Sequence, residues 1–130
     1  MSSAAIMATI KQKEAELKGL ETTKKQVDDL YGIMDCITSK FTKAGELISE
    51  AGSIDGLPFD KGKTAESGAE LQSITADIES TKGDLAARIA ALQSEIQMLY
   101  VEYWHAVEEE RRRAAEAAAA AERNSKRGRR

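Results

Sequence analysis

The segment Gly52-Ser-Ile-Asp-Gly-Leu-Pro-Phe-Asp-Lys-Gly62 lies between two long stretches whose apolar residues recur with heptad spacing. Glycine permits left-handed turns, while Pro58 lacks a backbone donor and pushes Leu57 out of helical space. The segment therefore predicts a structured break between two helices. Two helices joined by about a dozen residues form an antiparallel hairpin, whereas a single extended rod would have to tolerate Pro58 in its middle.

The stretch before this break carries a heptad seam. Its apolar positions recur by alternating steps of four and three residues: Ile6, Ile10, Leu17, Leu20, Val27, Tyr31, Met34, Phe41 and Ile48. Lys13 and Lys24 occupy two of the seam positions, so we expect the early part to bury little. Past residue 30 a second apolar row appears beside the seam: Leu30, Ile33, Ile37, Ala44 and Leu47. A face of this width indicates at least two neighbouring helices.

The stretch after the break carries a similar seam. Its members are Leu71, Ile74, Ile78, Leu85, Ile89, Leu92, Ile96, Leu99, Tyr103 and Ala106. Ser67-Gly-Ala-Glu70 has capping-box spacing and predicts a helix start there, with a start near Thr64 as the other option. Alanine has the highest helix propensity, so the helix should continue through the polyalanine run and fade at Asn124-Ser125.

These patterns predict an all-α fold, in which two long helices form one antiparallel, coiled-coil-like hairpin. The expected bounds are about 4–51 for helix one, about 52–66 for the loop and about 67–122 for helix two. Residues 1–122 would then form the hairpin, and residues 123–130 a disordered basic tail.

The segment from Ile96 to Val107 is apolar or aromatic around most of a helical circumference, and it holds the single Trp. If Ile48 faces Leu71, the numbers of facing residues sum to about 119. The segment then lies opposite a stretch of helix one whose only large apolar residues are Leu17 and Leu20. We therefore assign Ile96, Leu99 and Tyr103 to the hairpin. We expect a partner surface on the remaining residues, Tyr100, Val101, Trp104 and Val107. Incidental exposure is the alternative.

Charge is distributed unevenly along the chain. With 42% hydrophobic and 32% charged residues and one Pro, the composition is typical of long helices. The net charge of -3 combines five basic residues after position 122 with a body of charge -8. The tail could contact phosphate or an anionic membrane surface, or it could be a solubilising end. We favour the second interpretation, and we expect no nucleic-acid partner, because no stacking aromatics accompany the tail.

The residues needed for catalysis or metal binding are scarce. One His, one Cys, no zinc-ligand spacing and no glycine-rich phosphate loop argue against an enzyme and against a cofactor or metal. Adjacent carboxylates such as Asp28 and Asp29 are typical of a solvated helix face, and we assign Cys36 no role. No secretory signal and no apolar run of about 18 residues are found, so we expect a cytoplasmic protein without a transmembrane segment.

Two long helices, a glycine-containing turn, and aromatic residues followed by acids near the end of helix two resemble the WXG (ESAT-like) superfamily of type VII secretion. The loop Asp55-Gly-Leu-Pro-Phe-Asp-Lys-Gly62 stands where classical members carry Trp-x-Gly. The chain is therefore most similar to the small helical proteins encoded beside LXG toxins. The family export motif, an aromatic followed four residues later by an acid, is matched by Trp104 and Glu108 and, inside helix one, by Tyr31 and Asp35.

This resemblance implies a binding partner, targeting factor or chaperone for an LXG-type toxin. It also implies that the protein could leave the cytoplasm together with that toxin. The partner would be the toxin's helical N-terminal domain or another small helical protein. We expect it to dock on Leu30, Ile33, Ile37, Tyr100, Val101, Trp104 and Val107. The alternatives are a self-associating coiled-coil adaptor and a prefoldin-like hairpin chaperone.

Overall fold

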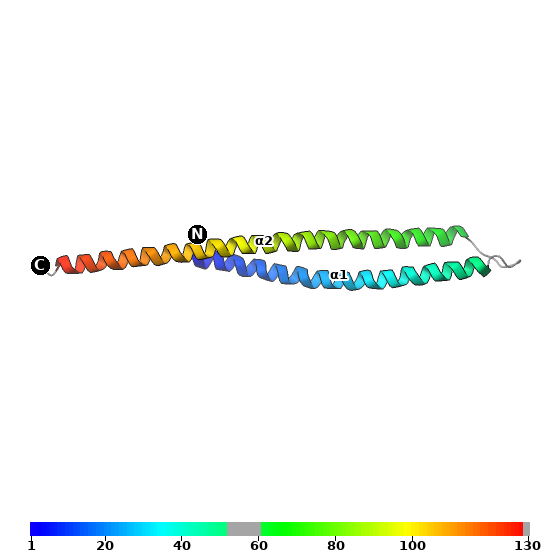
Figure 1. Ribbon diagram of the computed structural model, residues 1–130, viewed down its shortest axis with the longest axis horizontal. Coiled ribbons are helices and arrows are strands. Elements are labelled where there is room, and N and C mark those ends of the chain that lie inside the picture. The colour runs from blue at the N-terminus through cyan, green and yellow to red at the C-terminus, as the bar shows by residue number, and fades with distance from the viewer. Residues whose placement is uncertain (52–60, 129–130) are drawn as a thin grey trace. The chain divides into compact units, whose positions relative to one another are not determined.

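The computed structural model describes residues 1–51 and 61–128, and all regular structure in these ranges is helical. Helix α1 spans Ser3–Ala51 and helix α2 spans Lys61–Gly128 (Figure 1). The loop predicted around Pro58 falls partly on residues 52–60, which lie outside the described ranges. The described chain divides into two compact units, one formed by Met1–Lys18 with Ala90–Arg130 and the other by Gly19–Ile89. We refer to them as unit 1 and unit 2.

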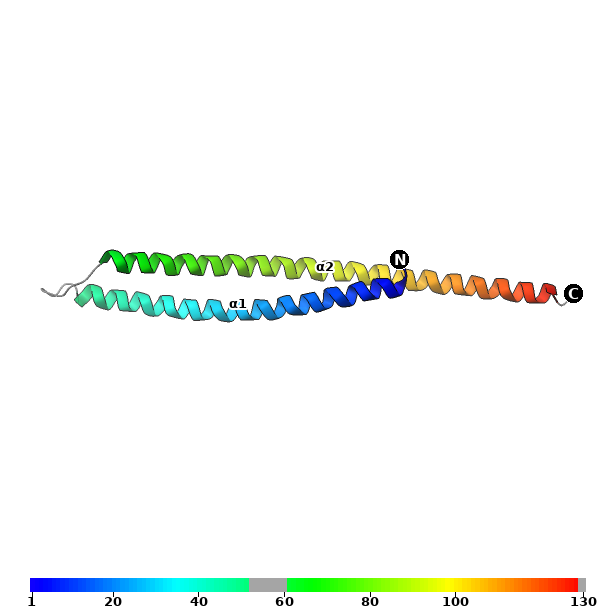
Figure 2. The same cartoon turned by 180° about the vertical axis from the view of Figure 1, so that it is seen from behind.

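Unit 1 pairs the first part of α1 with the second part of α2 in antiparallel orientation (Figure 2). Its core consists of four buried residues, Ile6, Ile10, Leu92 and Ile96, of which Ile10 and Leu92 are fully buried. Four of the five buried aliphatic side chains of the described chain thus lie in unit 1, where removal of apolar surface from water stabilises the pairing of the helices.

Polar contacts join the two helices of unit 1 at three levels. Lys13 Nζ lies 2.8 Å from Glu95 Oε2, which explains how a lysine is accommodated at a seam position. Tyr100 donates a 2.6 Å hydrogen bond to Glu14 Oε1, and Ser3 is hydrogen-bonded to Glu110 at the beginning of α1. Each pair joins an early residue to a late one, so the two segments run antiparallel.

Unit 2 pairs the rest of α1 with the beginning of α2, again antiparallel, and is packed less tightly. Among its seam residues only Ile89, at the end of the unit, is buried. The following seam residues are half-buried: Val27, Tyr31, Met34, Phe41, Leu71, Ile78 and Leu85. Lys82 Nζ lies 3.4 Å from Asp28 Oδ1 and 4.4 Å from the centre of the Tyr31 ring. Two helices that pair in both units agree with the predicted helical hairpin, while the half-buried seam indicates that unit 2 leaves apolar surface uncovered.

The predicted pairing register is wrong by about one and a half to three helical turns, depending on the pair. It placed Lys13 opposite residue 106 and Asp28 opposite residue 91, but Lys13 contacts Glu95 and Asp28 contacts Lys82. The reason is the start of α2 at Lys61 rather than near residue 67 or Thr64. The predicted capping box therefore lies inside α2, which begins six residues before the Ser67 start assumed for the pairing.

This shift changes what opposes the aromatic segment 96–107. It lies against the first turns of α1, which provide Ile6 and Ile10, and not against the Leu17 and Leu20 stretch. Segment 96–107 is thus better covered by α1 than the sequence indicated. Ile96 is buried and Leu99 and Tyr103 are half-buried, as the seam assignment requires.

Helix α2 continues six residues beyond the predicted end, through Gly128. Residues 123–128 therefore belong to the helix, and the predicted tail bounds are wrong for them; residues 129–130 lie outside the described ranges. An ion pair one turn apart supports this extension, with Lys126 Nζ 3.7 Å from Glu122. Lys126 and Arg127 in the last turn also interact favourably with the helix dipole.

Candidate functional site

The larger uncovered apolar surface belongs to unit 2. Leu30, Ile33 and Ile37, which the sequence marked as a second row on α1, are all exposed, and Ile33 is 57% exposed. Ile74 of α2 is also exposed, although its spacing had assigned it to the seam. We call Leu30, Ile33, Ile37 and Ile74 the unit 2 patch.

A groove between the helices of unit 2 connects members of this patch. It is lined by Val27, Leu30, Ile74, Asp77, Ile78 and Thr81. Leu30 and Ile74 therefore lie on the same side of the helix pair. The groove has four aliphatic lining residues, Val27, Leu30, Ile74 and Ile78. They provide a surface that a further helix can pack against.

The other side of unit 2 has a different chemistry. A groove there is lined by Asp35, Thr38, Gln72, Thr75, Ala76 and Glu79, so all but one of its lining side chains are polar. The contrast gives unit 2 one mostly polar side and one mostly apolar side. Only the apolar side is suited to helix docking, because burial of the polar side would leave carboxylates and hydroxyls without water.

Unit 1 has a second uncovered surface on α2. Met98, Val101 and Trp104 follow each other at steps of three residues, and Trp104 is 62% exposed. Met98 was missing from the set predicted from the sequence, although its spacing from Val101 is the signal that would have included it. We call these three residues the unit 1 patch.

The other two residues expected on this surface lie closer to α1. Tyr100 is half-buried with its hydroxyl on Glu14, and Val107 is half-buried. The hydrogen bond that Tyr100 donates to Glu14 raises the pKa of the phenol, since ionisation would place two negative charges together. Trp104 packs edge-on against Tyr103, with 5.2 Å between the ring centres.

The two candidate export motifs differ in accessibility. Trp104 and Glu108 are both exposed, and they lie one helical turn apart on the same face of α2. Tyr31 is half-buried beneath the Lys82 ammonium, while Asp35 lies on the polar side of unit 2. Only the first pair presents its aromatic ring to solvent.

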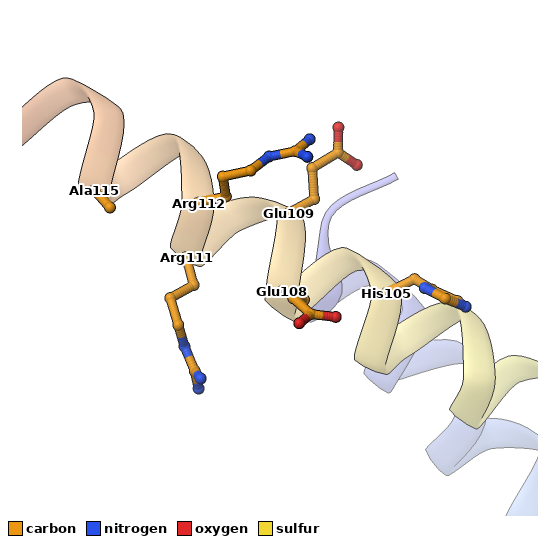
Figure 3. Close-up of a pocket in the computed structure, with 6 residues that line it drawn as sticks. All are labelled: His105, Glu108, Glu109, Arg111, Arg112 and Ala115. Atoms are coloured by element: carbon orange, nitrogen blue, oxygen red, sulfur yellow. The ribbon is translucent and has the colours of Figure 1, made fainter.

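A shallow depression near His105 has no features of a ligand site. Its lining residues are His105, Glu108, Glu109, Arg111, Arg112 and Ala115, all exposed and all from α2 (Figure 3). Arg111 and Glu109 point to different sides of the helix in Figure 3. Because a single helix cannot enclose a ligand, this depression is open surface.

The described residues contain no group of three or more His, Cys, Asp or Glu that could hold a metal ion. Cys36 is a free, exposed thiol. Over the same ranges, neither helix contains an apolar window long enough to cross a bilayer.

No family model, no curated protein and no solved structure matches the chain.

Proposed function

We propose that this protein is a non-enzymatic binding partner, acting as a targeting factor or chaperone, for an LXG-type toxin exported by a type VII secretion system. The observation that carries the proposal is the exposed unit 2 patch on a helix pair most of whose seam residues are only half-buried. Such a pair gains stability when another helical domain covers it. The toxin's helical N-terminal domain would supply the missing helices.

The unit 1 patch supports the same function in a second way. Trp104 and Val101 are exposed, and large exposed aromatics at the centre of a contact often dominate its binding energy. Trp104 and Glu108 also match the export motif of the WXG superfamily, which the sequence resembles. Docking of the toxin and recognition by the secretion machinery would then use neighbouring residues. Binding is purely non-covalent in this proposal.

Co-expression with the helical N-terminal domain of an LXG-type toxin tests the proposal. Light scattering after size-exclusion chromatography should give a heteromer of defined mass. Trp104→Ala should weaken that complex at least about tenfold, as expected for a hot-spot aromatic. The matched control is Ala120→Gln, at an exposed position far along α2, which should leave binding unchanged.

Two outcomes would contradict the proposal. One is a protein that ignores the toxin domain at every concentration tested. The other is a complex whose affinity is insensitive both to Trp104→Ala and to Ile33→Lys, since neither exposed patch would then take part. Circular dichroism of each variant shows whether the helices remain folded.

A further inference from the structure

A second heptad seam runs along the unit 2 part of α1. Its positions follow each other by alternating steps of four and three residues: Gln26, Leu30, Ile33, Ile37, Lys40, Ala44 and Leu47. All seven are exposed, whereas the adjacent seam of Val27, Tyr31 and Met34 is half-buried against α2. Two heptad seams on one helix are typical of a helix with two helical neighbours. The described chain provides only one.

We propose that the second neighbour is a second copy of this chain, with the two α1 helices antiparallel and related by a two-fold axis between Ile33 and Ile37. In this register Ile33 of each copy packs against Ile37 of the other. Leu30 of each copy meets the second copy's Lys40, whose long alkyl stem can cover it. The contact is self-complementary, as a two-fold interface must be.

The distribution of charge favours a second copy of the chain in this register. Asp29 and Lys43 lie fourteen residues apart, which is two heptads, so they share the same outer edge of the second seam, and both are exposed. Around the proposed axis Asp29 of each copy comes level with the second copy's Lys43, and Lys40 reaches the same carboxylate. Symmetry makes the set of contacts twice.

Helix α2 adds to the same contact. Leu30 and Ile74 line one groove, so a second copy that covers Leu30 also approaches Ile74. The contacts of Lys82 with Asp28 and the proximity of Gly68 to Phe41 place Ile74 at an intermediate level, near the proposed axis. Leu30, Ile33, Ile37 and Ile74 from two copies would then form the core of a four-helix bundle.

The contact between the two copies does not depend on the toxin. The second copy would occupy the unit 2 patch in the free protein, and a toxin domain that docks there would have to displace it. Both tests below use the full chain alone, so their failure leaves toxin binding to be judged by its own experiment.

The first test is the mass of the full-length protein in sedimentation equilibrium. We expect a dimer, which Ile37→Lys should convert to a monomer while helicity is retained. Asp29→Lys should raise the dimer dissociation constant at least about tenfold, because three cations then meet at each edge. Asp35→Lys makes the same charge change on the polar side of unit 2 and should not affect the dimer. Restoring complementarity with Asp29→Lys/Lys40→Glu/Lys43→Glu should recover most of the wild-type affinity.

The second test uses Cys36, the single cysteine of the sequence. A spin label on a lone cysteine reports a distance only between copies, and Cys36 lies near the proposed axis on the edge of Asp29 and Lys43. Neighbouring helices lie roughly 10 Å apart, so we expect spin separations below about 25 Å. A monomer at about 100 µM, a dimer indifferent to Ile37→Lys, or separations above about 40 Å would overturn the proposal.

Discussion

Glu110 of α2 accepts two hydrogen bonds from Ser3, at the first residue of α1. The Ser3 backbone nitrogen lies 2.8 Å from Glu110 Oε1, and the Ser3 hydroxyl lies 2.7 Å from Oε2. The carboxylate thus satisfies one of the backbone donors that a helix leaves exposed at its N-terminus, and its charge suits the positive end of the helix dipole. Ser2 adds a local cap, since its Oγ accepts a 3.2 Å hydrogen bond from the Ala5 nitrogen.

Acid should break the hydrogen bonds between Ser3 and Glu110. The two hydrogen bonds from Ser3, with the backbone bond contributing most, lower the pKa of Glu110 from its ordinary value of 4.5. The hydrogen bonds between Ser3 and Glu110 therefore stabilise the folded state fully above pH 4.5. This stabilisation disappears as the pH falls through the lowered pKa of the folded state. The protection factor for hydrogen exchange of the Ser3 amide, which corrects for the intrinsic pH dependence of exchange, should fall over this acidic range. In Glu110→Gln, that pH dependence should vanish, whereas the neighbouring Glu109→Gln should retain it.

Alkali should act on a different contact. Because Glu14 raises the pKa of Tyr100 above 10, the neutral phenol is favoured in the folded state. The hydrogen bond between Tyr100 and Glu14 therefore contributes fully to the free energy of unfolding below about pH 10. This contribution is lost as the pH rises through the raised pKa. Ultraviolet titration of Tyr100, identified by comparison with Tyr100→Phe, should show the raised pKa. Glu14→Gln should bring it back toward 10, and an unchanged titration would show that the contact does not persist in solution.

The core of unit 1 should dominate the stability of the described hairpin. Leu92→Ala removes a fully buried side chain and should cost about 2–4 kcal/mol in the free energy of unfolding. Met98→Ala removes an exposed side chain of similar size and should cost less than about 0.5 kcal/mol. Urea denaturation followed by circular dichroism measures both. Equal losses would mean that Leu92 is not the packing centre.

Glycines inside the helices offer a route to stabilisation. A methyl group at Gly83 would meet nothing within 4 Å, so Gly83→Ala should raise the free energy of unfolding by roughly 0.5–1 kcal/mol through helix propensity alone. A methyl group at Gly68 would lie 3.4 Å from the Phe41 ring. Gly68→Ala should therefore stabilise less than Gly83→Ala, unless the ring shifts. Thermal unfolding of the two variants side by side measures the difference.

The helical architecture and much of the residue assignment could be predicted from heptad spacing. Ile6, Ile10 and Ile96 are buried at seam positions, and the second row of Leu30, Ile33 and Ile37 is exposed. Spacing succeeds here because the side of a helix on which a residue lies follows from its position in the sequence.

The register between the helices could not be predicted in the same way. It depends on where α2 begins, and Ser67 and Glu70 gave a plausible but wrong start after Lys61. An error in the first residue of α2 shifts every predicted pair along both helices. The residues of α1 that lie opposite segment 96–107 were therefore predicted wrongly. Ile74 was misassigned for a related reason, because steps of three and four fit either of two adjacent helix faces.

Replacing Trp104 with photo-reactive benzoylphenylalanine, in cells that express an LXG-type toxin with a type VII secretion system, tests the proposed docking most directly. We predict a covalent adduct between position 104 and the toxin's helical N-terminal domain, and no such adduct from the same probe at Ala120. The proposal is contradicted if position 104 yields no toxin adduct while the toxin is exported normally.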